Sequence, residues 1–173
     1  MTLTGFEQTP ETEIGQALFE ELIWIHSMIR HDLQIVKQIA ADAATNKSSE
    51  ALRAEIRELK AKSILWQLKM NCLRYCRFVH SHHNLEDAVF FPALRQTNPA
   101  ISPIVDKLEA DHRDVSGLLD NVEEAADALT KDDAQAVRKR IVESLDVLAE
   151  HLLAHLDYEE LNAGPTIRRL QNL

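Results

Sequence analysis

The stretch HSHHNLEDAVFFPAL, from His80 to Leu94, combines a histidine and a glutamate four residues apart with apolar residues at helical spacing. His82 and Glu86 therefore share one face of a helix, separated by a rise of about 6 Å. The apolar neighbours place this face beside a protein core, where polar groups need partners. The stretch predicts a helix that brings polar side chains into the interior.

The same spacing returns near the end of the chain, at His155 and Glu159. One such pair on a helix is often a local charge pair, but two pairs with single histidines on the intervening segments are much rarer by chance. Neutral imidazoles bind one metal ion terminally, and a carboxylate can bridge two. Together with His26 and His112, the two pairs predict four imidazoles and two bridging carboxylates around two metal ions.

Apolar residues three and four positions apart predict four long amphipathic helices. Short connections between them favour an antiparallel up-down four-helix bundle, so the predicted fold class is all-α with a short C-terminal helix. Ser48 or Ser49, Ser102 and Asp132 are predicted to cap the second, third and fourth helices. The predicted ranges are 14–43, about 51–94 with a break near Lys62–Ser63 as an alternative, about 103–129, a fourth helix from the Asp132 turn to about 161, and a terminal helix from Thr166.

Composition agrees with one helical domain. The chain has 173 residues, of which 45% are hydrophobic, enough to fill a single core. Four glycines and five prolines provide little material for a sheet rich in turns. Cys72 and Cys76 lie four apart in a helical pattern and are predicted to be reduced core thiols, with a supporting role beside a metal as the alternative.

The charge distribution excludes several partners. A net charge of −9, with 19 scattered basic residues, argues against a surface for nucleic acid or anionic membranes. No apolar run reaches the length of a membrane span, and residues 1–13 lack the features of a signal peptide. A cytoplasmic protein is expected, and whether it forms a homodimer is left open.

The motifs resemble a known family. His82-His83-x-x-Glu86-Asp87, followed by Phe91-Pro92, resembles the signature of hemerythrin HHE cation-binding domains, and His155-x-x-Tyr158-Glu159-Glu160 resembles its second half. The similarity covers roughly residues 15–165 of a predicted single domain spanning 1–173. His26-x-x-x-Arg30 and Asp111-His112 resemble the first-helix and third-helix segments of the family. The resemblance implies metal-ligand roles for His26, His82, Glu86, His112, His155 and Glu159.

One departure concerns function. Hemerythrins that carry oxygen place two histidines four apart on the third helix, but Ser116 stands four residues after His112 here. Here the carboxylate that follows His155 is Glu159, four residues on, whereas the carriers have an aspartate one residue further along. The pattern is closer to HHE-type iron-dependent regulators and redox proteins, and it argues against reversible oxygen carriage.

Four further side chains are weaker candidates. His83 and Asp87 are predicted to be solvated or to support the ligands. His151 could replace His155 as a ligand, because it lies one turn earlier on the same face. Tyr75, two turns before His82, could bring its phenol to an open coordination position. Trp24 and Trp66 are predicted to pack in the core or at the bundle end.

The resemblance implies a non-haem di-iron centre with two iron ions, with an oxo bridge as an option. We expect it to bind dioxygen, peroxide or nitric oxide in redox sensing or oxidative-stress handling. Peroxide disproportionation is the enzymatic version, for which no catalytic residue is assigned. The alternatives are a non-enzymatic, iron-responsive interaction module, another metal such as zinc, and a metal-free helical scaffold.

Overall fold

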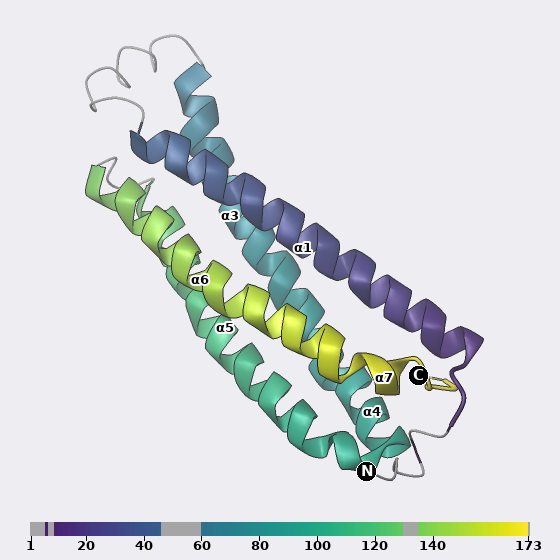
Figure 1. Cartoon of the computed structure of the whole chain (residues 1–173). Helices are drawn as coiled ribbons and strands as arrows, with labels where there is room; N and C mark the ends of the chain where they lie inside the picture. Colours follow the sequence, from purple (N-terminus) through teal and green to yellow (C-terminus); the bar gives the residue numbers. More distant parts are fainter. Residues whose placement is uncertain (1–5, 7–8, 46–59, 130–134, 173) are drawn as a thin grey trace.

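The computed structural model of the protein describes residues 6, 9–45, 60–129 and 135–172 (Figure 1). Every regular element in these ranges is helical and none is a strand, so the predicted all-helical fold class is confirmed. In chain order the elements are α1 (Glu13–Thr45), α3 (Lys60–Leu85), the π-helical segment η1 (Glu86–Phe90), α4 (Phe91–Thr97), the 3₁₀ segment η2 (Pro99–Ile101), α5 (Ser102–Ala128), α6 (Gln135–Asn162) and α7 (Gly164–Ile167).

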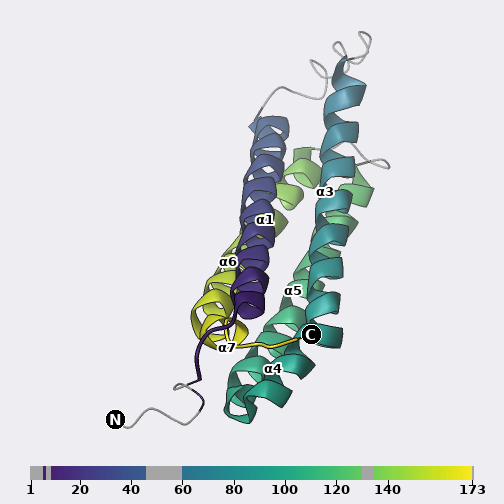
Figure 2. The same cartoon turned by 90° about the vertical axis from the view of Figure 1, so that its right-hand side faces the viewer.

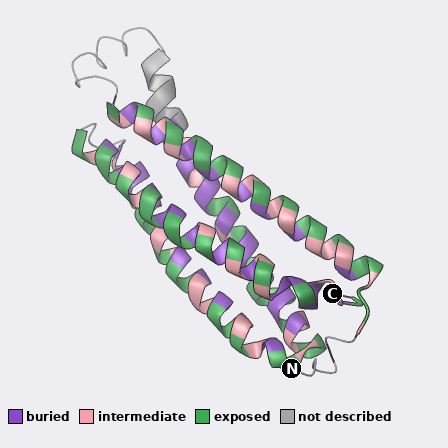
Figure 3. Cartoon of the chain, in the orientation of Figure 1, coloured by how far each residue is buried: buried purple, intermediate pink, exposed green. Residues whose placement is uncertain are grey.

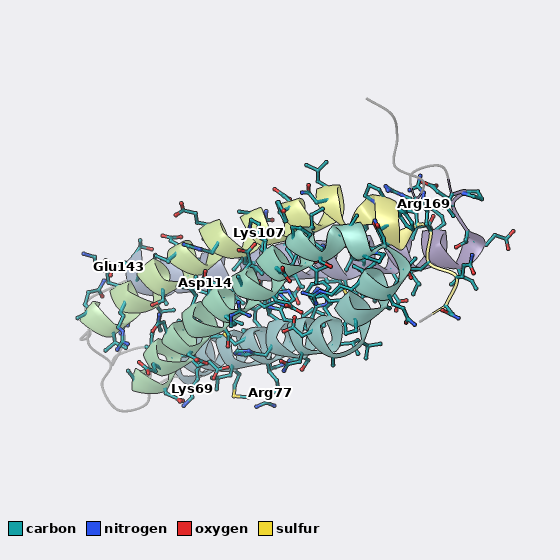
Figure 4. All side chains as sticks on the ribbon, turned by 90° about the horizontal axis from the view of Figure 1, so that it is seen from below. Lys69, Arg77, Lys107, Asp114, Glu143 and Arg169 are labelled. Atoms are coloured by element: carbon teal, nitrogen blue, oxygen red, sulfur yellow. The ribbon has the colours of Figure 1, made fainter. Side chains whose placement is uncertain are left out.

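The four long helices α1, α3, α5 and α6 lie side by side (Figures 1 and 2). Helices α1 and α5 each pack against both α3 and α6, and the short helices α4 and α7 pack together at one end. Buried faces point inward along each long helix, as Figure 3 shows, because the apolar residues line one side. Charged side chains such as Arg77 and Glu143 point away from the helices (Figure 4). Among the described helices, none combines the length and apolar character needed to cross a membrane.

Two apolar clusters fill the interior of the described part of the chain. The main cluster is built from buried residues within 29–43 of α1, 68–79 of α3, 115–129 at α5 and 141–156 of α6. The end cluster lies where α4 and α7 cover the long helices. It consists of Leu22, Phe90, Phe91, Leu94, Ile101, Val105, Leu108, Ala163, Ile167 and Leu170.

A layer of buried polar side chains, here called the polar layer, separates these clusters. On α1, His26 lies between Leu22 of the end cluster and Ile29 of the main cluster. On α3 the order is reversed, since His82 follows Val79 of the main cluster and precedes the end cluster. Helix α5 has the order of α1, and α6 has the order of α3. Neighbouring long helices therefore run in opposite directions, and their polar residues meet at one level.

The predicted helix over residues 51–94 is divided in the structure, after Leu85 and not near Lys62–Ser63. Helix α3 ends at Leu85, and η1 inserts a wider turn in which the Phe91 N–H donates to the carbonyl oxygen of Glu86. Pro92 lies in the first turn of α4, where a missing N–H is tolerated. A π turn leaves no mark in apolar spacing, and such turns are frequent at functional sites. The predicted start of this helix, with its caps at Ser48 or Ser49, lies outside the described residues, as does the predicted cap at Asp132.

The structure tests the predictions made for Ser102, Trp24 and the two cysteines. Ser102 does not cap α5: it is the first helical residue, and its hydroxyl donates to the Pro99 carbonyl oxygen at 2.9 Å. Trp24 is 60% exposed, so the prediction that it packs in the core or at the bundle end is wrong. The side chain of Trp66, for which the same was predicted, lies outside the described part of the chain. Cys72 and Cys76 are buried and unpaired in the main cluster, as predicted, and burial raises the pKa of the Cys72 thiol to about 12.

Gly15 allows the first turn of α1 to approach the backbone that follows α7. A side-chain carbon at this position would lie 2.6 Å from the carbonyl oxygen of Ile167, and closer still to the backbone of Arg168. The neighbouring Thr12 N–H donates to the Arg168 carbonyl oxygen at 2.9 Å. This contact holds α1 and α7 together beside the end cluster.

We expect Gly15→Ala to destabilise the protein by about 1–3 kcal/mol, because backbone atoms have to move apart to accept the added carbon. Gly117→Ala is the matched control. Nothing lies within 4 Å of its added carbon, and alanine in an exposed helix interior stabilises by about 0.5–1 kcal/mol. Denaturant unfolding of the three proteins measures both effects. Wild-type stability in Gly15→Ala would contradict the described packing of α1 on α7.

Candidate metal centre

Seven ionisable side chains from the four long helices and η1 converge in the polar layer, and all of them are buried. A folded protein keeps this many polar groups in its interior only when they are paired or when they bind an ion. They are His26 from α1, His82 and His83 from α3, Glu86 from η1, His112 from α5, and His155 and Glu159 from α6.

The first group of neighbouring ligand atoms, cluster 1, consists of His26, His82 and Glu86, whose atoms lie within 4.8 Å of one another. Nε2 of His26 is 3.2 Å from Nε2 of His82, which in turn is 3.2 Å from Oε1 of Glu86. Two ring nitrogens this close cannot both direct a proton at each other, so at least one presents a lone pair. Two imidazoles and a carboxylate oxygen thus face one point.

The second group, cluster 2, consists of His83, Glu86, His112 and His155. Nε2 of His112 is 3.1 Å from Nε2 of His155 and 3.5 Å from Oε2 of Glu86. The ring of His83 stacks on that of His112, with ring centroids 4.0 Å apart and an interplanar angle of 10°. Nε2 of His83 is buried without a hydrogen-bond partner in the described part of the chain. Cluster 2 therefore holds three imidazoles.

The two glutamates lie between the clusters. Glu86 directs Oε1 toward His82 and Oε2 toward His112. Oε2 of Glu159 lies 3.4 Å from Nε2 of His26 and 3.9 Å from Nε2 of His155. Among the described residues, none of the four carboxylate oxygens has a hydrogen-bond partner. Because a buried charge without compensation costs several kcal/mol, these residues fit a site for two metal ions, which would supply the positive charge.

Burial keeps three of the imidazoles neutral. Burial, together with the neighbouring imidazoles of His26 and His155, lowers the pKa of His82 to about 3. Burial and the neighbouring imidazoles also lower the pKa of His83 and of His112. A neutral imidazole retains the lone pair that a metal ion requires. The polar layer thus presents these side chains in the form that binds metal.

The carboxylates create a surplus of negative charge. Burial, followed by the charge of Glu159, raises the pKa of Glu86 well above its usual value. Burial lowers the pKa of His26, but the nearby carboxylates of Glu159 and Glu160 outweigh this effect and raise it. The raised pKa of Glu86 shows that a further negative charge is disfavoured here, and the raised pKa of His26 shows that a positive charge is favoured. A cation placed between these groups is therefore stabilised.

Carboxylates outside the clusters orient the imidazoles. Nδ1 of His26 donates to Oε1 of Glu160 at 2.8 Å, and Arg30 donates to the same oxygen at 2.7 Å. Nδ1 of His112 donates to Asp87 at 2.8 Å. Because a carboxylate only accepts, the proton lies on Nδ1 and the Nε2 lone pair faces the centre. Asp87 therefore supports a ligand, which is one of the roles predicted for it.

Comparison with protein families identifies the chain. The description "Hemerythrin HHE cation binding domain" matches residues 17–167. The chain belongs to this family. No curated protein and no solved structure matches it. The family assignment predicted from the motifs is thus confirmed, and the matched range contains all seven side chains of the polar layer. A cation-binding HHE domain agrees with both clusters.

The six ligands predicted from the HHE motifs all lie in the polar layer. Five of them belong to cluster 1 or cluster 2, and Glu159 lies between the two. Neither His151, which is exposed, nor Tyr75, which packs in the main cluster, belongs to either group. That the six bind metal stays a prediction.

The structure excludes one of the two roles predicted for His83, that of a solvated side chain. This side chain is 5% exposed and belongs to cluster 2, not to a solvated rim. Helix α3 packs against both α1 and α5, and consecutive helical residues are rotated by about 100°. His82 therefore faces His26 on α1, while His83 faces His112 on α5. The sequence signal for the position of His83 was the pair of adjacent histidines on a helix that packs against two other helices.

His83 also changes the meaning of Ser116. The HHE domain lacks a second histidine on α5, but α3 provides a fifth imidazole in its place. The number of imidazoles therefore no longer argues against oxygen carriage.

We expect His82→Ala and His83→Ala each to lose about one of two bound metal ions, because each removes a ligand from a different cluster. Glu86→Ala is expected to lose more than either, since Glu86 belongs to both clusters. Elemental analysis per chain, with circular dichroism to verify the helices, measures the losses. The exposed His151→Ala is the control and should retain both ions. Full metal content in His83→Ala would remove His83 from the ligand set.

Proposed function

We propose that this HHE-domain protein is a non-haem di-iron protein that binds dioxygen, peroxide or nitric oxide, in redox sensing or in the handling of peroxide. One observation carries the proposal: Glu86 and Glu159 each lie between imidazoles of both clusters, without hydrogen-bond donors. Carboxylates in that position are suited to bridging two metal ions, and imidazole with carboxylate suits iron. Bound iron supplies single-electron exchange and coordination positions for small ligands.

The protein orients the imidazoles and covers one side of cluster 2. Glu160, supported by Arg30, keeps a proton on Nδ1 of His26, and Asp87 does the same for His112. The ring of Phe91 stacks on that of His112, with centroids 5.2 Å apart, and covers cluster 2 on the side of the end cluster. These contacts keep the imidazoles oriented before an ion binds, which increases metal affinity.

Iron is favoured over structural zinc by the donor set. Structural zinc sites are closed, tetrahedral and commonly contain thiolates, but Cys72 and Cys76 lie in the main cluster and belong to neither metal cluster. Shared carboxylates between two histidine groups favour a pair of ions instead. Zinc in the purified protein would contradict this preference.

The proposal also covers the arrangement of the long helices, the number of domains and the cellular location. The reversed order of the clusters along neighbouring helices supports an antiparallel up-down four-helix bundle of hemerythrin type. The family match over residues 17–167 supports one domain for the whole chain, 1–173. Two buried, unpaired cysteines suit a reducing compartment, in agreement with a cytoplasmic location.

We expect the purified protein to contain two iron ions per chain, with a ligand-to-iron charge-transfer band in the near ultraviolet. After anaerobic reduction, oxygen should oxidise the protein lastingly, because Leu85 and Val89 at the mouth of a pocket beside His82 are 62% and 45% exposed and admit solvent. Optical titration measures this, and added hydrogen peroxide tests disproportionation in the same cell. Repeated recovery of the reduced spectrum would favour oxygen carriage, and absence of iron would contradict the di-iron proposal.

The second candidate is a non-enzymatic, iron-responsive interaction module. It is favoured by the polar layer itself, since seven buried ionisable groups make the stability of the bundle depend on bound cations. In this function a partner would distinguish the ordered, metal-bound bundle from a loosened metal-free form.

Thermal unfolding after chelation separates the two candidates. We expect the metal-free protein to unfold about 10 °C lower yet cooperatively, because ligand linkage contributes about 4 kcal/mol at saturation while the main cluster persists. Circular dichroism at increasing temperature, with and without chelator, provides the measurement. Loss of the cooperative transition would favour the interaction module. An unchanged transition would contradict the view that cations stabilise the polar layer.

A further inference from the structure

A pocket of about 240 Å³ lies beside cluster 1, between α1 and the α3–η1 segment. Two of its lining residues, His82 and Glu86, belong to that cluster. The rest of the lining is apolar except for the exposed carboxylate of Glu21. The apolar side chains are Leu18, Leu22, Ile25, Leu85, Val89 and Phe90. The pocket therefore joins a half-exposed apolar wall to a buried polar floor.

The floor offers a hydrogen-bond acceptor, because each carboxylate oxygen of Glu86 has two lone pairs and keeps one when the other faces a metal ion. Glu86 is 4% exposed, and neither of its carboxylate oxygens has a donor among the described residues. Cluster 1 contains two imidazoles and cluster 2 contains three, so the centre is less crowded on the side of the pocket. A molecule in the pocket can thus place one polar end against Glu86 and cluster 1.

The π-helical segment shapes this wall. Glu86, Val89 and Phe90 all belong to η1 and all line the pocket. One element therefore supplies both the shared carboxylate of the metal centre and the apolar surface next to it. π turns of this kind are frequent at functional sites.

The opposite side of the centre is different. A groove of about 430 Å³ between α5 and α6 reaches His155 and is lined by charged residues, including Lys107, Asp114 and Glu150. Lys107 and Asp114 lie along α5 in Figure 4. Water and hydrogen peroxide suit this charged groove. The apolar pocket instead favours a ligand with an apolar body, and Glu21 at its edge disfavours an anion.

We propose that the apolar pocket binds small, neutral organic hydroperoxides and the corresponding alcohols, with the hydroxyl or hydroperoxyl group toward Glu86. This inference rests on the proposed function, because it names the class of peroxide that the di-iron centre would meet. The apolar body lies against Leu22 and Val89, and the polar end donates to a carboxylate oxygen that lacks a donor.

Methyl NMR of the purified protein with cumyl alcohol tests the proposal. This probe is neutral and combines an aryl body with one hydroxyl group. We expect saturable shifts of the Leu22, Leu85 and Val89 methyl signals, with a dissociation constant on the order of 1 mM. The anion 2-methyl-2-phenylpropanoate, of similar shape, should bind at least tenfold more weakly. Shifts distributed over the whole protein, or none, would overturn the proposal.

Two substitutions fill the pocket from opposite walls. Val89→Trp on η1 and Leu18→Trp on α1 should each weaken cumyl alcohol binding at least tenfold while the metal content stays unchanged. Ala154→Trp, in the charged groove, is the matched control and should bind the probe as wild type does. Equal binding by a folded filling variant and the control would overturn the proposal. Iron analysis of the same samples tests the di-iron centre separately, so a protein without iron that still binds the probe contradicts only the proposed function.

Discussion

The two carboxylates held between imidazoles in the interior, Glu86 and Glu159, are the constraint on which the rest of the structure depends. Negative charge at this depth has to be balanced, and no described side chain donates a hydrogen bond to either group. The surrounding imidazoles, the raised pKa of Glu86 and the outer carboxylates all follow from this arrangement. The apolar clusters on either side compensate for it, since a fully buried leucine or isoleucine contributes about 1.5–3 kcal/mol.

The arrangement of the helices was predictable because it depends on spacing. Apolar residues three and four apart predict the long helices, and α1, at Glu13–Thr45, extends the predicted range of 14–43 by one or two residues at each end. Histidine and glutamate four apart have to share a helix face, which is why six residues of the polar layer could be named. The family motifs then added a role for each of them.

What the sequence did not predict depends on tertiary contacts. His83 lies in the polar layer because α3 packs against two helices. The spacing of residues along one helix does not show how many helices surround it. The π turn at η1 changes hydrogen bonding without changing the residue pattern. Trp24 is exposed although its residue type favours burial, since its position on α1 faces away from the packed helices.

The position of the polar layer between two apolar clusters also fixes the register of the bundle. If one long helix slipped by a single turn, about 5.4 Å, its histidine would leave the shared level and enter an apolar cluster, while an apolar residue would face the carboxylates. Each slipped arrangement would leave a buried polar group without a partner, even before any ion binds. The polar layer thus selects one alignment of the four long helices, much as a single buried polar residue sets the alignment of a coiled coil.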